Sequence, residues 1–287
     1  MASQMIGIIG GSGLYKIEGI KDIETVLIDT PFGKPSDSFT IGTLEGRKVS
    51  FLPRHGKNHT ILPSELNFRA NIYGMKKLGV EYIIAVSAVG SMKEEIRPLD
   101  IVIPDQFFDR TVKRVSTFFG DGLVGHVSFA DPICSALANT LYTAAKSHNV
   151  RVHKGGTYLC MEGPLFSTRA ESNVYRQWGV SVIGMTNLQE AKLAREAEIC
   201  YSTLAMATDY DCWHVSEEPV TLEMILENLN KNVETAKKIL KAAIPKIELK
   251  RSCECASAAK NAIVTHKDFI PETTKKKLDV IFGKYIR

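Results

Sequence analysis

Short apolar runs rich in β-branched residues alternate along the chain with segments in which apolar residues recur every three or four positions. The apolar runs predict core strands, at residues 5–9, 49–52, 82–86, 101–103, 180–183 and 203–207. The helical periodicity predicts amphipathic helices within residues 66–77, 133–144 and 222–240, and a further helix over 271–285. Strands that alternate with helices are typical of an α/β fold.

This alternation runs through the whole sequence, so we expect one domain over residues 1–287, with helices packed on a mixed or mainly parallel sheet. No linker, repeat or low-complexity segment divides the sequence. In such folds ligands bind at the carboxyl ends of strands. The polar, glycine-containing segments of this chain directly follow the predicted strands, and we look for the functional site among them.

The composition excludes several classes of protein. The net charge of +4 is small, and the lysines and arginines are scattered rather than gathered into the basic stripe of a nucleic-acid-binding protein. No apolar stretch is long enough to span a bilayer, and the first residues lack the features of a signal peptide. We therefore expect a cytoplasmic protein whose partners include neither a nucleic acid nor a membrane.

The chain has six cysteines: Cys134, Cys160, Cys200, Cys212, Cys253 and Cys255. Thiols and disulfides are both open readings, and cysteine positions alone do not define a pairing. Cys253 and Cys255 form a C-x-C pair. That spacing is shorter than the usual one for zinc, and no second pair stands nearby in the sequence, so we expect no metal.

Donors suited to phosphate follow several predicted strands. A glycine-rich turn carries Ser12, whose hydroxyl and backbone amides can approach an anion closely. Arg54 offers a planar fork that matches phosphate oxygens, and the adjacent His55 can donate a further hydrogen bond. Ser87 and Ala88 follow the strand at 82–86. The structural alternatives are a tight turn, a solvated surface arginine and close packing of small residues.

Two later segments suit a flat ring and a sugar. Phe166 follows a Gly-Pro turn and can stack on a base, while Met185 and Thr186 offer soft contact area and a hydroxyl. The alternatives are structural. Ser167 or its neighbour, with Glu171, can form the capping box of a helix, and a methionine such as Met185 is more often a core residue.

Two aspartates follow the last predicted core strand. Asp209 and Asp211 are alternate residues of an extended segment, so their side chains share one face. A protonated carboxyl at this place can hydrogen-bond N7 and the exocyclic amine of adenine and donate the proton that makes adenine a better leaving group. The structural alternative is a simple aspartate turn.

Together these segments resemble the 5′-methylthioadenosine phosphorylases of the trimeric purine nucleoside phosphorylase family. The segments that carry the resemblance are residues 6–14, 29–37, 54–56, 59–60, 105–107, 109–111, 162–164 and 205–213. The resemblance covers roughly residues 5 to 245 and implies a single-domain α/β fold with a mixed, partly closed sheet flanked by helices. Residues 247–287, with the C-x-C pair and the terminal helix, are divergent from the family.

The resemblance also implies roles for single residues. Phosphate would be bound by Ser12, Arg54, His55, Ser87, Ala88 and Thr186. The nucleoside would contact Phe166, Ser167, Met185, Asp209 and Asp211, with Leu222 and Ile225 as an apolar wall for the methylthio group. His126 would reach into the site of a neighbouring subunit, which implies a homotrimer or a dimer of trimers.

The implied reaction is phosphorolysis of 5′-methylthioadenosine to adenine and 5-methylthioribose 1-phosphate, with Asp209 as the acid and with no cofactor or metal. Apolar Leu222 and Ile225 favour a thioether over a 5′-hydroxyl. One alternative is a phosphorylase of broader specificity that acts on adenosine, or on inosine and guanosine. A more remote alternative is a purine- or phosphate-binding protein without catalytic activity.

Overall fold

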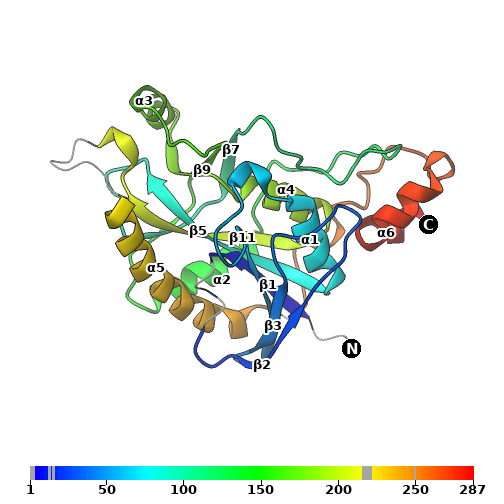
Figure 1. Ribbon diagram of the computed structural model, residues 1–287, viewed down its shortest axis with the longest axis horizontal. Helices are drawn as coiled ribbons and strands as arrows, with labels where there is room; N and C mark the ends of the chain where they lie inside the picture. The colour runs from blue at the N-terminus through cyan, green and yellow to red at the C-terminus, as the bar shows by residue number, and fades with distance from the viewer. Residues whose placement is uncertain (1–3, 12–13, 15–16, 215–221, 249) are drawn as a thin grey trace.

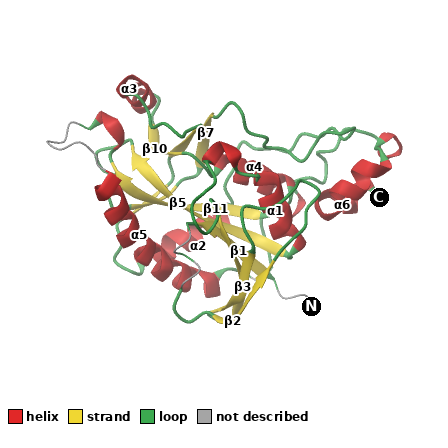
Figure 2. Ribbon diagram, viewed as in Figure 1, coloured by secondary structure: helices red, strands yellow, loops and turns green. Residues whose placement is uncertain are grey.

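A large mixed sheet forms the centre of the molecule, with helices on both of its faces (Figures 1 and 2). The computed structural model describes residues 4–11, 14, 17–214, 222–248 and 250–287, and only the backbone of 222–226. The strands are β1 (Met5–Gly10), β2 (Lys21–Val26), β3 (Phe39–Leu44), β4 (Arg47–Pro53), β5 (Val80–Ser91), β6 (Ile101–Ile103), β7 (Gln106–Arg110), β8 (Val152–Lys154), β9 (Thr157–Met161), β10 (Val180–Gly184) and β11 (Cys200–Asp209). The helices are α1 (Phe68–Lys77), α2 (Ser135–Lys146), α3 (Arg169–Gln177), α4 (Leu188–Glu196), α5 (Leu222–Ala243) and α6 (Glu272–Ile286).

The sheet branches at its longest strand, β5. The main path runs β2-β3-β4-β1-β5-β10-β9-β7, while β11 also pairs with β5 and continues through β6 to β8. Along most of its length β5 is parallel to β1 and β11, and near its end it pairs antiparallel with β10. Strands from both branches therefore end close to the carboxyl end of β5. This arrangement confirms the predicted mixed sheet flanked by helices.

All six predicted core strands are present, as β1, β4, β5, β6, β10 and β11, but the predicted end of β5 is wrong. The sequence indicated a loop from Ser87 onward, whereas the strand continues to Ser91. Small residues in this stretch let neighbours approach on both sides. Gly90 pairs with Ile183 of β10 and with Asp209 of β11, and a Cβ at Gly90 would lie 3.2 Å from Oδ1 of Asp209.

The sequence analysis missed the strands β2, β3, β7, β8 and β9. Every residue of β2 except the last is exposed, so it has no apolar face to detect, and β8 has three residues. The predicted helices are present as α1, α2, α5 and α6, while α4 was not predicted. At α3 the capping box is confirmed with Thr168 as the N-cap and Glu171 as its partner. No helix in the described part of the chain is long and apolar enough to cross a membrane.

Candidate active site

The carboxyl end of β11 carries two aspartates that are held close together. Asp209 is the last residue of the strand, and its Oδ1 accepts from the backbone amide of Asp211 at 2.8 Å. Its Oδ2 accepts from the hydroxyl of Thr208 at 2.7 Å. Asp211 Oδ2 accepts at 2.6 Å from the hydroxyl of Ser172, a residue of α3. The bond from the Asp211 amide to the Asp209 carboxyl is the aspartate turn that the sequence analysis gave as its structural alternative, and Asp211 begins a 3-10 helix rather than continuing an extended segment.

Both carboxyls titrate above their ordinary range. Burial raises the pKa of Asp209, against the hydrogen bonds from Thr208 and the Asp211 amide, which lower it. Burial also raises the pKa of Asp211, and the nearby negative charge of Asp209 adds to that shift, while the Ser172 hydroxyl opposes it. Raised pKa values favour a protonated carboxyl, which is the form that a general acid requires.

The backbone behind these aspartates is anchored by α5. The side-chain amide of Asn232 donates to the carbonyl of Ala207 at 2.9 Å, and that of Asn228 donates to the carbonyl of Thr208 at 2.9 Å. On the other side, the indole of Trp213 donates to the carbonyl of Ser91 at 2.7 Å. The carboxyls therefore stand on a backbone fixed from both flanks, and a positioned acid needs such support.

Arg54 is buried in an ion pair that the sequence analysis did not foresee. Its Nε donates to Oε1 of Glu190 at 2.5 Å, and its Nη2 donates to Oε2 of the same carboxylate at 3.2 Å. Glu190, in the first turn of α4, is fully buried and also accepts from the hydroxyl of Tyr201 at 2.9 Å. The only sequence signal for Glu190 was an acidic residue a few positions after Met185 and Thr186.

This pairing limits what Arg54 can offer to an anion. The guanidinium also donates to the carbonyl of Val86 at 3.0 Å and to that of Ile9 at 3.2 Å. Of the five N–H groups of an arginine, four are thereby engaged, and one on Nη1 remains. The planar fork expected to hold phosphate is turned toward Glu190, so Arg54 can contribute one hydrogen bond and its charge.

The hydrogen bonding of His55 also differs from the expectation. Burial, with Arg54 close by, lowers the pKa of His55 to about 4, so the ring is neutral at neutral pH. Nδ1 lies 2.8 Å from the carbonyl of Ile61, and a carbonyl can only accept, so Nδ1 carries the proton. Nε2 is then an acceptor, suited to a sugar hydroxyl or a protonated phosphate oxygen rather than to a bare phosphate oxygen.

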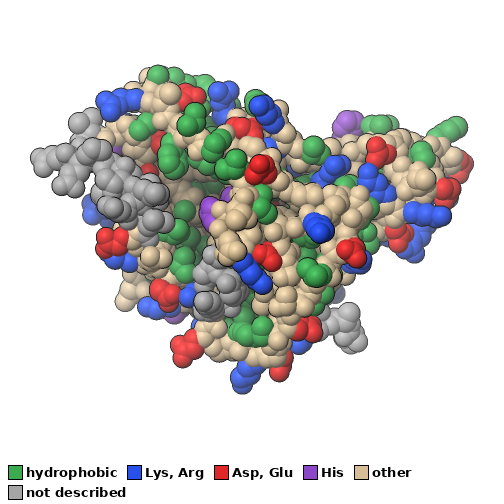
Figure 3. All heavy atoms as spheres, in the orientation of Figure 1, with side chains coloured by type: hydrophobic (Ala, Val, Ile, Leu, Met, Phe, Trp, Pro, Cys, Tyr) green, Lys and Arg blue, Asp and Glu red, His purple; other side chains and the backbone are tan. Residues whose placement is uncertain are grey.

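Three hydroxyls, from β5, from β9 and from the segment after β10, meet close to Arg54. The hydroxyls of Ser87, in β5, and Thr186, after β10, lie 3.4 Å apart, and the hydroxyl of Tyr158 lies 3.5 Å from that of Ser87. Ala88 follows Ser87 directly in β5 and accepts its hydroxyl through the backbone carbonyl at 3.3 Å. The structure thus brings the predicted residues Ser87, Ala88 and Thr186 together. Figure 3 shows a recess near the end of β5, with hydrophobic side chains and a histidine along its walls.

The loop that carries Phe166 stands at the edge of the site. The side chain of Phe166 is 70% exposed, so it is available to stack on the flat ring of a ligand. The backbone carbonyl of Ser167 lies 3.3 Å from Sγ of Cys212, so the loop lies beside the segment that follows Asp209. A Cβ at Gly163 would lie 2.6 Å from the sulfur of Met185, which places the Met185 side chain directly against this loop.

Arg114 is a second residue that the sequence analysis missed. It donates to the carbonyl of Met185 at 2.5 Å and to that of Met161 at 3.2 Å, and it pairs with Glu162 at 3.2 Å. Glu162 also accepts from the hydroxyl of Ser64 at 2.8 Å. Arg114 therefore fastens the Phe166 loop to the end of β10. No motif marked it, because its partners are mostly backbone carbonyls far away in sequence.

One predicted residue, His126, makes its backbone contact away from this cluster. His126 is exposed on a long segment that runs from β7 toward α6, and its amide donates to the carbonyl of Ala262 at 2.8 Å (Figure 1). Ser12 and the side chains of Leu222 and Ile225 lie outside the described residues.

Comparison with known proteins agrees with this geometry. The chain belongs to the phosphorylase superfamily, whose family model matches residues 5–245. It is 59% identical over 284 residues to the S-methyl-5′-thioadenosine phosphorylase of Geobacter sulfurreducens, with 99% of each chain covered. It is 60% identical over 280 residues to the protein of the same name from Koribacter versatilis, covering 98% of this chain and 96% of that protein. These similarities confirm the resemblance inferred from the sequence.

Solved structures show the same fold. A methylthioadenosine phosphorylase from an antarctic soil metagenomic library superposes with a TM-score of 0.93 at 48% identity, covering 98% of this chain and 99% of that one. Methylthioadenosine phosphorylase from Schistosoma mansoni, solved in complex with adenine, superposes with a TM-score of 0.81 at 36% identity, covering 90% of this chain and 96% of that one.

Proposed function

We propose that this chain is an enzyme that catalyses phosphorolysis of 5′-methylthioadenosine, releasing adenine and 5-methylthioribose 1-phosphate. The proposal is supported by relatives of that name that are 59% and 60% identical over nearly the whole chain. The structural observation that carries it is the pair of aspartates with raised pKa values at the end of β11. Inorganic phosphate is the co-substrate, no cofactor takes part, and the enzyme acts in the cytoplasm.

Asp209 is the proposed acid. In its protonated form it donates to N7 of adenine as the bond between C1′ and N9 lengthens, so that adenine departs without a full negative charge. Asp211 accepts from the exocyclic amine, a contact that a 6-oxopurine cannot make. Phe166 and Ser167 cover the base, and Met185 packs against the ribose. Phe166 is exposed in the single chain and can move onto a bound ring.

The hydroxyl side of the site receives phosphate. The hydroxyls of Ser87 and Thr186, the amide of Ala88 and the remaining N–H of Arg54 surround the anion, with Ser12 as a further donor. Phosphate below the ribose stabilises the positive charge that develops at C1′ and then captures that carbon. His55, neutral at neutral pH, accepts from a ribose hydroxyl or a protonated phosphate oxygen. Holding both reactants in place supplies a large part of such catalysis.

The complete site needs a second copy of the chain. His126 lies on a segment whose backbone pairs with residues 262–264, between the C-x-C pair and α6. We propose that it enters the site of a neighbouring subunit in a homotrimer, or in a dimer of trimers. Leu222 and Ile225 form the apolar wall for the methylthio group in the same proposal.

The experiment that tests the function is a substrate panel. Adenine or hypoxanthine release is measured from 5′-methylthioadenosine, adenosine and inosine, each with and without phosphate. Phosphate-dependent turnover that is fastest with 5′-methylthioadenosine is the expected result. Preference for inosine would overturn the role given to Asp211, and turnover without phosphate would overturn the phosphate site. A protein that binds adenine but turns over none of the three would be a purine-binding protein.

A further inference from the structure

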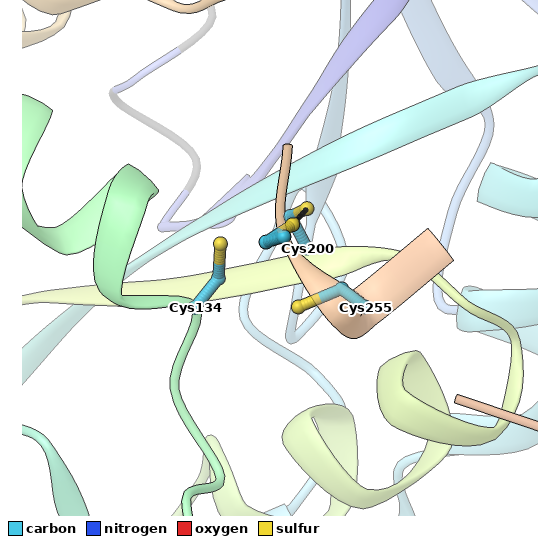
Figure 4. Close-up of side chains that lie close together, drawn as sticks. Cys134, Cys200 and Cys255 are labelled. Atoms are coloured by element: carbon cyan, nitrogen blue, oxygen red, sulfur yellow. Dashed lines mark hydrogen bonds between the residues drawn. The ribbon is translucent and has the colours of Figure 1, made fainter. Parts of the chain in front are cut away.

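Four cysteines converge at the opposite end of β11 from the aspartates. The Sγ atoms of Cys134, Cys200, Cys253 and Cys255 all lie within 4.8 Å of one another, and those of Cys200 and Cys253 lie 3.3 Å apart. Figure 4 shows the side chains of Cys134, Cys200 and Cys255 pointing toward one another. Cys134, Cys200 and Cys255 are buried, and Cys253 is half-buried.

These cysteines come from three separate parts of the chain. Cys134 is the N-cap residue of α2, and Cys200 is the first residue of β11. Cys253 and Cys255 flank the start of a short 3-10 helix, Glu254–Ser257, in the C-terminal segment that follows the residues matched by the family model. The sequence analysis found no second pair near the C-x-C motif and therefore expected no metal. The fold supplies that second pair from positions more than fifty residues away in the sequence.

The spacing of the sulfurs fits one metal ion. Zinc binds thiolates at about 2.3 Å in a tetrahedron, which places the sulfurs about 3.8 Å apart. Four sulfurs within 4.8 Å of one another need only small rotamer adjustments to reach that arrangement. An iron–sulfur cluster, with several irons and bridging sulfides inside the ring of ligands, needs its cysteines farther apart. The geometry therefore favours a mononuclear site.

We propose that Cys134, Cys200, Cys253 and Cys255 form a structural zinc site. Binding of Zn²⁺ displaces the thiol protons, up to four of them, and leaves a tetrathiolate centre of net charge −2. All four positions are filled by the protein, so no place is open for a substrate, as in structural rather than catalytic zinc sites. The ion joins the C-terminal segment to α2 and to β11.

The site has a consequence for the segment that carries His126. Beyond the C-x-C pair, the chain runs alongside that segment: the amide of Val264 donates to the carbonyl of Val124 at 2.9 Å, and Gly125 forms a bridge with Ile263. The amide of His126 donates to Ala262 in the same stretch. Zinc would therefore fix one of the two strips of backbone that set the position of His126.

The first test is the metal content of the full-length protein, purified without chelators and with a thiol reductant that does not bind zinc. Elemental analysis is expected to give about one zinc per chain. After exchange for cobalt, the protein is expected to show the intense thiolate-to-cobalt absorption and the visible bands of a tetrahedral sulfur site. Iron in place of zinc, or no metal at all, would overturn the proposal.

Thiol counting separates the site from disulfides. In the proposed state, all six cysteines react in denaturant with a chelator present, whether or not the protein has been treated with reductant. A deficit of two or four thiols before reduction, together with absent zinc, would show that the cluster forms disulfides and would overturn the proposal.

A variant pair localises the metal. Cys253→Ser is expected to lose most of the bound zinc, and Cys212→Ser, a cysteine outside the cluster, is expected to keep it. If Cys253→Ser keeps its full zinc, the metal lies elsewhere and the assignment fails. Because the metal content and the cobalt spectrum are measured on the unmodified protein, they test the proposal even if Cys253→Ser does not fold. Neither readout depends on the enzymatic reaction, so they are independent of the proposed function.

Discussion

The two ends of β11 carry two kinds of reactive cluster. At the carboxyl end, Asp209 and Asp211 are fixed by Thr208 and Ser172, and we propose that they bind the purine base. At the amino end, the sulfur atoms of Cys200 and three further cysteines lie within 4.8 Å of one another. The strand between them has ten residues, which at about 3.3 Å per residue separates the clusters by roughly 30 Å.

The difference shows how one rigid strand can serve both activity and stability. The nine residues of β11 that precede Asp209 are all buried, so packing fixes the strand and with it the positions of both clusters. The aspartates at the carboxyl end can still form hydrogen bonds with a substrate, whereas the cysteines at the amino end make their contacts within the chain. Sites this far apart without shared partners generally have additive effects, so changes at one end should not alter the properties of the other.

The largest effect is expected from Asp209→Asn. The amide keeps the shape of the carboxyl but cannot donate an acid proton, so kcat for 5′-methylthioadenosine should fall by roughly 10² to 10⁴. The KM for phosphate should change little. The wild-type rate should also decline as the pH rises through the raised pKa of Asp209, because the protonated form is lost, and the variant should lack this decline.

The matched variant for that measurement is at the other end of the strand. Cys253→Ser, assayed at a temperature where it is folded, should keep a kcat close to that of the wild type, because the hydrogen bonds that Ala262 and Val264 make with the segment of His126 do not involve the cysteines. If it lowered kcat as much as Asp209→Asn does, the two ends of β11 would not be independent. An Asp209→Asn enzyme with unchanged turnover would remove the acid role.

The second effect concerns the buried ion pair between Arg54 and Glu190. Glu190→Gln leaves the buried Arg54 guanidinium without an anionic partner, and breaking such a pair from one side costs about 3–5 kcal/mol of unfolding free energy. Chemical denaturation measures this loss. Glu227→Gln, which breaks the exposed pair with Lys231, is the control and should leave the unfolding free energy nearly unchanged. Equal losses of unfolding free energy in the two variants would show that burial does not make the pair of Arg54 and Glu190 more important than an exposed pair.

The third effect is a pH dependence at the other end of α4. Burial raises the pKa of Glu196 from 4.5 to about 7, against hydrogen bonds from the Phe118 amide and the Thr117 hydroxyl. The folded protein therefore holds a proton that the unfolded chain has lost between about pH 4.5 and 7. Across that window the unfolding free energy contributed by Glu196 should fall by roughly 3 kcal/mol as the pH rises.

Glu196→Gln tests this assignment, because glutamine does not titrate. Its amide oxygen can accept from the Phe118 amide, and its NH2 group can donate to the oxygen of the Thr117 hydroxyl. Denaturant unfolding measured at intervals between pH 5 and 8 should show a shallower decline for Glu196→Gln than for the wild type. Parallel curves for the two proteins would assign the pH dependence to other groups.

The sequence predicted those parts of the molecule that depend on local pattern. The apolar runs located the central strands, and the order of short motifs indicated the family and the residues at the end of β11. Glu190, Arg114 and the thiol cluster were missed for one physical reason. Each is defined by partners far away in the sequence, such as Arg54 for Glu190, and a fold is needed to bring them together. The hydrogen-bonding direction of His55 likewise depends on the carbonyl of Ile61.

The smallest effect sharpens the comparison at the amino end of β11. Tyr285, in α6, donates to Oε1 of Glu198 at 2.6 Å, and Glu198 stands two residues before Cys200. Tyr285→Phe removes this one hydrogen bond, while Glu198 still accepts from the Ala259 amide at 3.1 Å and pairs with Lys284. The variant should therefore lose about 1–2 kcal/mol of unfolding free energy, measured by denaturation.

The same variant should leave kcat and the zinc content unchanged, because α6 contacts neither the aspartates nor the sulfur atoms through Tyr285. A loss of zinc in Tyr285→Phe would mean that docking of α6 and closure of the thiol cluster are one cooperative event. The amino end of β11 would then be a larger unit than the four cysteines alone, in contrast to the compact set of contacts around Asp209.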